Sequence, residues 1–467
     1  MGDITTADRR KGTKIDCIHP TQESLSSRGG LSLFVRYLKG IGLDESLERL
    51  FGSIRRSRKG QPIAEIFKQL FCFLVDGTSR HLAYFDHLRD DAGYAGVIES
   101  APETLLSCHA VKRFFRAFWW PRIYLFRRLL QKLFLWRLQL AQPKVIVLGI
   151  DTMVMDNHYA RKRHGVRHTY KKVKGFAPLQ MTWDRFLVDA VFRAGDHHSN
   201  HSDTVEKMVD HVVRQIRKHY RRDVPIVIRS DSGFFDQKLF AAFEALQVGY
   251  LCTGKLYGDV KTLAEKAPDE AWTRFKSKGT IWEYIEFGDR RGSWKQFRRA
   301  IYCRRVSSNG QLFFDFARSH TVFYTNIGHG GLLQEQLREA GLDSLLDPKT
   351  LILNHHDRGK DELVHRALKD FAAQELPFTK FAQNAAFYYT MLLAFDLYEA
   401  FKEDVCAPAI PIASYATTFR RKIIDIAAKL VRHAGRIILK VPQAAWQHLT
   451  LQELWEKSAN PPVFQWV

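Results

Sequence analysis

The chain has 467 residues and lacks several features that would assign it to a common class of protein. It contains no run of about 18 uncharged apolar residues, so a membrane-spanning helix is not expected. Its beginning, MGDITTADRRKGTK, has no apolar core of a secretory signal. Six cysteines are scattered without a Cys-x-x-Cys pair, which indicates neither a zinc site nor a disulfide framework. We therefore expect a cytoplasmic location with reduced thiols.

The sequence is also short of acids, because 50 Asp and Glu stand against 71 Lys and Arg, a net charge of +21. Such a surplus suits a polyanionic partner, since each neutralised phosphate releases counterions. Residues 109–137 hold eight Lys or Arg and no acid, and residues 159–175 hold seven and no acid. A solvated surface is the simpler interpretation of each stretch. For 159–175 we favour contact with DNA backbone, because it closely follows a strand that ends in Asp151.

The first part of the chain is typical of helices. Apolar residues recur at spacings of three and four over residues 30–140. Within this part, TLLSCHAVKRFFRAF predicts a helix with Ser107 as N-cap and with Lys112, Arg113 and Arg116 facing outward. Basic side chains on one helix face make this segment a candidate DNA-reading helix, with an ordinary core-packed helix as the alternative.

An α/β pattern begins after Pro143. The segments KVIVLGID (144–151) and VPIVIRSDSG (224–233) are apolar runs typical of buried strands, and each run reaches an Asp. FLVDAVFRAG (186–195) predicts another strand, and residues 202–220 predict an amphipathic helix capped by Ser202. Strand, strand, helix, strand in this order favours an α/β fold.

The later part of the chain alternates between the two kinds of element. Short runs of β-forming residues separated by Gly, Asn and Ser predict a β-rich insertion over 256–320, and HTVFYTNIG (320–328) predicts a return to the main sheet. Residues 378–401 predict a long buried helix, and the basic amphipathic segment 415–441 predicts another helix.

Two carboxylates stand where chemistry is expected in such a fold. Asp151 and Asp231 each end an apolar strand, and ligands of open α/β sheets collect at the carboxyl ends of strands. If the strands are neighbours, the carboxylates converge, and a hard divalent cation such as Mg²⁺ or Mn²⁺ would relieve their repulsion. An Asp that merely ends a strand or caps a turn is the alternative. Asp156, Asp189 and Asp236 rank lower, because none ends so clean a run.

A third acid lies in the segment NHHDRGKDELVHRALKDF (354–371). If one helix spans this segment, a turn of about 100° per residue places His355, Arg358, Glu362 and Lys369 within an arc of roughly 60°. Arg358 would grip a phosphate bidentately and Lys369 would add a point charge. Glu362 would complete a metal site. A solvent-exposed face of paired Glu and Lys is the alternative.

Together these motifs resemble those of DDE transposases from bacterial insertion sequences, in the cut-and-paste, hairpin-forming branch. HDRGKDELVHRALK matches the signature Tyr-x2-Arg-x3-Glu-x6-Lys of that branch, except that His355 stands at the Tyr position. His356 is a second candidate for that role. RSDSGF (229–234) resembles the motif around the second Asp, and PFTKFAQNAAFYYTMLLAFDL resembles the helix after the Glu. The resemblance extends from about residue 30 to residue 441.

The resemblance implies an α/β fold with a ribonuclease H-like catalytic core. The implied parts are an N-terminal helical DNA-binding region (1–140), the core in two pieces (141–255 and 321–400, the second with the catalytic helix), the β-rich insertion (256–320) and a C-terminal helical region with a possible role in dimerisation (401–467).

The resemblance also implies a reaction and its partners. Asp151, Asp231 and Glu362 would hold two Mg²⁺ or Mn²⁺ ions that support phosphodiester hydrolysis and strand transfer at transposon ends, through a DNA hairpin. A Trp of the insertion would stack on a flipped base. Trp282 and Trp294 are the candidates, with Trp272 behind them, and a place in the insertion's own core suits each equally well. The implied partners are double-stranded DNA, as terminal inverted repeats and as target, and a second copy of the chain. The implied location is the bacterial nucleoid, with no membrane association.

The candidate DNA contacts are His355, Arg358, Lys369, Arg161, Lys162, Arg163, Lys171, Lys172, Lys112, Arg113, Arg116, Arg298 and Arg299. The segment RAGDHHSNHSD (193–203) matches no standard zinc spacing, so a DNA-facing loop is favoured over a metal site there. Two other functions remain open. One is a sequence-specific DNA-binding protein on an inactive nuclease core, against which the three acids speak. The other is a nuclease of the same fold, such as a resolvase, that performs no strand transfer.

Overall fold

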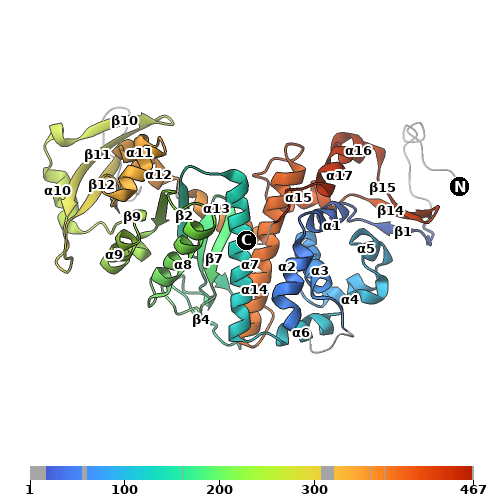
Figure 1. Ribbon diagram of the computed structural model, residues 1–467. Coiled ribbons are helices and arrows are strands. Elements are labelled where there is room, and N and C mark those ends of the chain that lie inside the picture. Colours follow the sequence, from blue (N-terminus) through green and yellow to red (C-terminus); the bar gives the residue numbers. More distant parts are fainter. Residues whose placement is uncertain are drawn as a thin grey trace.

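The computed structural model describes residues 17–54, 60–160, 162–306, 320–357, 359–372 and 374–464. These residues form a mixed α/β structure with one large sheet and flanking helices (Figure 1). Within the described ranges, no helix combines the length and apolar character that crossing a bilayer requires.

The main sheet contains nine strands among the described residues, in the order β10-β11-β12-β13-β9-β8-β2-β6-β7. Its inner strands are β2 (Ile146–Thr152), β6 (Leu179–Trp183), β7 (Phe186–Val191), β8 (Ile226–Ser230) and β9 (Gly249–Thr253). β2 pairs antiparallel with β6 and parallel with β8, and β9 continues parallel to β8. The strands expected from the apolar runs at 144–151, 186–195 and 224–233 are confirmed.

The insertion strands extend this sheet at one edge. They are β10 (Thr273–Ser277), β11 (Thr280–Asp289), β12 (Arg298–Val306) and β13 (His320–Thr325). β13 pairs antiparallel with β9, with Tyr324 opposite Cys252, so residues 320–325 do return to the main sheet. The β-forming run at 312–319 lies outside the described residues.

Helices α7 (Trp120–Ala141) and α14 (Phe381–Phe401) lie side by side in the middle of the molecule, between the main sheet and the N-terminal helices (Figure 1). α14 is buried from Asn384 to Phe401, which confirms the expected buried helix. Its Asp396 accepts a hydrogen bond from the Leu187 amide at 2.9 Å, and the Tyr389 hydroxyl donates to the Ala190 carbonyl at 2.7 Å. These bonds attach α14 to β7, so α14 joins the sheet to the helical part.

The other helices flank this centre. They are α1 (Leu31–Gly40), α2 (Leu43–Phe51), α3 (Ile63–Asp76), α4 (Tyr84–Arg89), α5 (Ala92–Val97), α6 (Cys108–Arg116), α8 (Thr204–His219), α9 (Gln237–Ala245), α10 (Gly258–Lys266), α11 (Leu332–Glu339), α12 (Pro348–His356), α13 (Gly359–Phe371), α15 (Ala416–Phe419), α16 (Gln443–His448) and α17 (Leu451–Ala459). The expected cap of α8 is wrong by one residue, because Asp203 rather than Ser202 precedes the helix and makes no side-chain cap bond.

The expectation of helix over 415–441 is wrong from Ala428 onward. Strands β14 (Ala428–His433) and β15 (Arg436–Lys440) form a hairpin there, and β1 (Ser24–Ser26) adds a third strand. The hairpin turns at Ala434 and Gly435, which have φ values of 47° and 76°. Two consecutive residues with positive φ suit a tight hairpin turn and cannot continue a helix, so this turn outweighed the helical periodicity.

Candidate active site

Two carboxylates lie at the same edge of the sheet, on neighbouring parallel strands. The register of β2 and β8 places Ile150 opposite Ser230, so Asp151 in β2 lies next to Asp231, which directly follows β8. Adjacent strands are about 4.8 Å apart. The Asp151 carboxylate accepts a hydrogen bond from the Thr152 amide at 2.6 Å, and that of Asp231 accepts one from the Gly233 amide at 2.9 Å. The prediction that the strands before Asp151 and Asp231 are neighbours is therefore confirmed.

Helix α13 packs on these two strands through Asp361. The buried Asp361 carboxylate accepts a hydrogen bond from the Arg229 guanidinium at 2.7 Å. A Cβ added at Gly149 would lie 2.6 Å from Asp361 Cγ, so only glycine permits this close approach. Gly149 and Arg229 are paired in register, two residues before Asp151 and Asp231. Asp361 thus holds α13 against both strands. The next residue, Glu362, is exposed.

One turn further along α13, His365 contacts the first carboxylate directly. His365 Nδ1 lies 3.4 Å from Asp151 Oδ2, and the histidine is 9% exposed. Sequence reasoning missed both Asp361 and His365, although they lie within the quoted motif. Their spacing of four residues, next to apolar Val364 and Leu368, was the signal for a helix face that packs on the sheet.

Tyr170 lies within electrostatic range of Asp151, Asp231 and Glu362. Its hydroxyl donates a hydrogen bond to the Thr152 carbonyl at 3.3 Å. Burial, followed by the charges of Asp151, Asp231 and Glu362, raises the pKa of Tyr170 to about 12. The three carboxylates, distant in the chain, therefore all lie in the neighbourhood of one phenol. Tyr170 was not among the residues expected from the sequence.

Basic residues border the same place. Lys369 follows Glu362 by two turns of α13, and burial, then the charge of Lys171, lowers its pKa, against Asp156 and Asp151, which raise it. Lys171 lies in the hairpin between β4 (Arg167–His168) and β5 (Lys174–Phe176), which pairs with β3 (Met155–Asp156). Lys171 and Asp151 therefore both lie close enough to Lys369 to act on its charge.

The other basic residues expected near the site are placed as follows. Lys162 and Lys172 are exposed, Arg163 is partly buried, and Arg161 and Arg358 lie outside the described residues.

A family model described as "Transposase DDE domain group 1" matches residues 14–460. The chain belongs to this transposase family. A search of curated proteins finds no match. Among solved structures, the chain is similar to the piggyBac transposase in a cryo-EM structure of its synaptic complex with hairpin DNA, at 11% identity and a TM-score of 0.42. The likeness covers 86% of this chain and 81% of that one.

The single helix assumed for residues 355–369 of this transposase is absent. α12 ends at His356 and α13 begins at Gly359, so His355 does not share the helix face of Glu362. The His355 ring is buried, stacks on Phe323 with centroids 4.7 Å apart, and shares a hydrogen bond of 2.9 Å with the Thr253 hydroxyl. His355 is therefore a buried side chain packed against the sheet, and its contact with DNA stays a prediction. His356 packs against Trp282 at 4.4 Å, and burial lowers its pKa.

The tryptophans of the insertion differ from one another. Trp294 is 8% exposed and packs among Phe235, Phe240 and Tyr324, which makes it a core residue. Trp282 is partly buried against α12. The Arg304 guanidinium covers Trp272 at 3.5 Å. Trp282 is thus the better placed of the two base-stacking candidates.

The two arginines expected to contact DNA from the insertion are held by acids of the transposase itself. Arg298 is buried and forms an ion pair with Glu244. Arg299 is paired with Glu286 and donates to the Ile327 carbonyl at 2.6 Å. Arg298 is therefore a buried residue paired within the protein, without a charge exposed for DNA.

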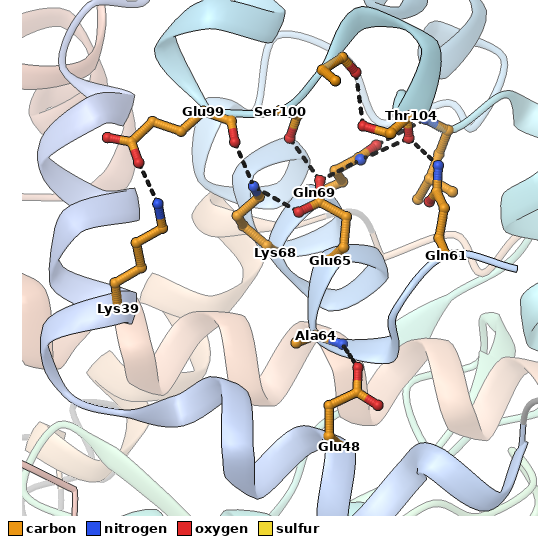
Figure 2. Close-up of polar contacts among 12 residues, drawn as sticks. Lys39, Glu48, Gln61, Ala64, Glu65, Lys68, Gln69, Glu99, Ser100 and Thr104 are labelled. Carbon is orange, nitrogen blue, oxygen red and sulfur yellow. Dashed lines mark hydrogen bonds and ion pairs between the residues drawn. The ribbon is translucent and has the colours of Figure 1, made fainter. Parts of the chain in front are cut away.

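The candidate DNA-reading helix α6 is held firmly at its start. Figure 2 shows the buried Gln69 of α3, whose amide donates to the Thr104 carbonyl at 3.0 Å, and Gln69 also accepts from the Leu106 amide at 2.8 Å. Ser107 then caps α6 by accepting from the Ala110 amide, as expected.

The basic residues of α6 are displayed by this arrangement. Lys112, Arg113 and Arg116 are exposed. Three exposed cations on one helix are well placed to contact phosphate groups of DNA.

DDE transposases generally use divalent metal ions, and the donor set of this site suits them. Asp151, Asp231 and Glu362 offer only carboxylate oxygens, the ligands that hard cations such as Mg²⁺ and Mn²⁺ prefer. In the described parts of the chain, no group of three or more His, Cys, Asp or Glu is already arranged to hold a metal. Among the described residues the three carboxylates are therefore candidate ligands by their chemistry and not a preformed cluster.

Proposed function

We propose that the protein is a cut-and-paste DNA transposase whose catalytic acids are Asp151, Asp231 and Glu362. The observation that carries this proposal is the meeting of three elements at one edge of the sheet. Two parallel strands present Asp151 and Asp231 in adjacent positions, and α13 is fastened over the same strands one residue before Glu362. All three carboxylates act on the phenol of Tyr170.

We further propose a ribonuclease H-like core for the strands β7, β6, β2, β8 and β9. Support comes from their order and direction. β7, β6 and β2 form an antiparallel meander, and β8 and β9 then continue parallel to β2. The catalytic acids lie on the central strand and on its parallel neighbour, as the chemistry of converging strand ends requires.

In this proposal Asp151, Asp231 and Glu362 would hold two Mg²⁺ or Mn²⁺ ions. Bound ions lower the pKa of an attacking hydroxyl group and stabilise the leaving oxygen of a phosphodiester. Lys171 and Lys369 orient the phosphate by charge. Because its pKa is about 12, Tyr170 stays protonated at neutral pH and offers a hydrogen-bond donor next to the acids.

The same proposal names the substrate and the assembly. The 3′-OH freed by hydrolysis attacks the opposite strand to give a hairpin, and after reopening it attacks target DNA. Trp282 stacks on the flipped base. The substrates are the terminal inverted repeats and a target duplex, bound by a homodimer in the bacterial nucleoid. The exposed residues of α6 and of the β4–β5 hairpin supply contacts to DNA backbone.

Cleavage and joining assays on DNA that carries the element's ends test the proposed function. Asp231→Asn keeps the hydrogen bond to the Gly233 amide but loses the charge, so cleavage in Mg²⁺ falls to background while DNA binding persists. Asp236→Asn is the matched control, because Asp236 caps α9 and Asn caps equally well.

Three outcomes of this assay would contradict the proposal. Unchanged cutting by Asp231→Asn would remove Asp231 from the site. Cutting by the native protein without hairpins or joined products would indicate a plain nuclease. Binding without any cutting would indicate a DNA-binding protein on an inactive core.

A further inference from the structure

Three histidines gather in the loop between β7 and α8, residues 196–203, which we call the His loop. The rings of His197 and His201 stack with centroids 3.9 Å apart and planes at 12°. The ring of His198 lies 5.4 Å from that of His201. His198 is exposed, and the other two are partly exposed. A ligand can therefore reach this cluster from solvent.

The His loop lies next to the catalytic carboxylates. A Cβ added at Gly233 would lie 2.8 Å from Ser199 Oγ and 3.0 Å from Asp231 Oδ1, so the loop touches the turn that holds Asp231. Arg193 connects the loop to the other strand end. Its guanidinium donates to the Ser199 carbonyl at 3.2 Å and to the Thr152 hydroxyl at 2.9 Å. The loop is therefore fixed to both strands that carry the acids.

Arg193 adds a buried positive charge next to the His loop. It is 3% exposed, and its third contact is the Ala177 carbonyl at 3.0 Å. Among the described residues, its hydrogen bonds go to the Ala177 and Ser199 carbonyls and the Thr152 hydroxyl, with no carboxylate among them, and no set of three His, Cys, Asp or Glu there suits a metal. Burial lowers the pKa of Arg193 to about 10, so it stays charged at neutral pH. At the His loop, this buried cation without a carboxylate partner favours a bound anion.

We propose that His197, His198 and His201 form a phosphate site for the DNA strand that passes the catalytic carboxylates. This inference rests on the proposed function, because DNA is the anion it assigns. Imidazolium groups donate hydrogen bonds to phosphate oxygens, and charged donors make the stronger bonds. The exposed His198 can reach such a phosphate directly, and the buried His197 Nδ1 makes no hydrogen bond to a described residue.

Phosphate binding here is coupled to proton uptake. In the free protein, burial, then the charge of His201, lowers the pKa of His197, with Arg193 and His198 acting in the same direction and Asp196 against them. Asp231 faces the loop across Gly233. A phosphate offsets the repulsion among the cations and thereby raises the imidazole pKa values. DNA affinity therefore rises as the pH falls.

The test measures DNA affinity by fluorescence anisotropy in EDTA, at constant ionic strength, from about pH 8 to about pH 6. Over this range the affinity of the native protein rises about tenfold more than that of His197→Asn/His198→Asn/His201→Asn, the change that a pKa shift of about one unit gives. The control is His433→Asn/His448→Asn, because these two exposed histidines belong to β14 and α16, which lie on the right in Figure 1, away from β7 and α8. We expect the DNA affinity of this control variant to change with pH as that of the native protein does.

Equal pH dependence in the triple variant and the native protein overturns the inference while leaving the proposed function intact. Absence of DNA binding by the native protein at every pH overturns the proposed function itself. If the triple variant unfolds, the exposed His198→Asn alone replaces it. It must reduce the pH dependence by more than the control does, and an unchanged dependence contradicts the inference.

Discussion

The sheet edge that carries Asp151 and Asp231 and the β-rich insertion are both rich in arginine and lysine, but their positive charges have different partners. In the insertion, Arg274 and Arg304 donate to Glu283 at 2.9 and 3.0 Å, and Arg298 pairs with Glu244. The segment 159–175 beside Asp151 contains no acid at all. The number of cations therefore says little about DNA contact. A cluster of Arg and Lys remains available to a polyanion only where no Asp or Glu of the protein pairs with it.

The largest expected effect comes from the contact that fixes α13 on the strands. Gly149→Ala would place its Cβ 2.6 Å from Asp361 Cγ and 2.7 Å from Thr182 Oγ1. We expect a loss of about 1–3 kcal/mol in the free energy of unfolding and little remaining cleavage, because Glu362 moves with the helix. Gly292→Ala in the insertion is the control, since a Cβ there meets nothing within 4 Å. Thermal unfolding and a cleavage assay measure both. Equal stability of the two variants would contradict the packing argument.

The second prediction concerns His365. Metal-binding carboxylates depend on neighbouring groups that orient them, and losing one costs about 10–100-fold in affinity or activity. His365→Gln places its amide where Nε2 lay, so the contact that Nδ1 makes with Asp151 is lost. We therefore expect the Mg²⁺ concentration for half-maximal cleavage to rise about tenfold or more. His365→Asn places an amide near the former Nδ1 position, 3.4 Å from Asp151, and restores much of the activity. If the two variants behave alike, the contact with Asp151 has no positioning role.

The third prediction separates the two basic regions by salt dependence. Each phosphate contact contributes about 0.9 to the slope of log affinity against log salt. Lys171→Ala/Lys172→Ala should reduce that slope by about two, because both lysines are exposed beside the site. Arg298→Gln should leave the slope unchanged, because Arg298 is buried against Glu244. A slope that falls for Arg298→Gln would show that the insertion arginines contact DNA after all.

The smallest effect is expected from releasing cations of the insertion. Burial alone would raise the pKa of Glu283, but hydrogen bonds from Arg274 and Arg304 lower it below its ordinary value. The stability from these bonds is therefore present above the pKa of unfolded Glu and is lost as the pH falls through the lower folded pKa. Glu283→Gln lowers stability at neutral pH, by less at acid pH, and slightly strengthens non-specific DNA binding. Denaturant unfolding at several pH values checks the first effect. An equal loss at all pH values would contradict the role of these bonds.

Elements of the fold could be predicted from the sequence where a single local pattern determined each of them. The apolar runs before Asp151 and Asp231 predicted the strands of the site, and Ser107 predicted the start of α6. It was insufficient where tertiary contacts decide. The helix break between His356 and Gly359 and the burial of His355 against Phe323 depend on packing on the sheet. The turn at Ala434 and Gly435 gave a hairpin in place of a helix. Asp361, His365 and Tyr170 acquire their roles only through residues distant in the chain.

The central claim is that Asp151, Asp231 and Glu362 together hold divalent metal ions at the scissile phosphate. The most direct measurement is an anomalous difference map at the manganese edge, from crystals of the protein bound to end DNA in Mn²⁺. The account predicts manganese peaks bounded by the carboxylates of all three residues. Peaks elsewhere, or none while the DNA phosphate lies at the sheet edge, would contradict it.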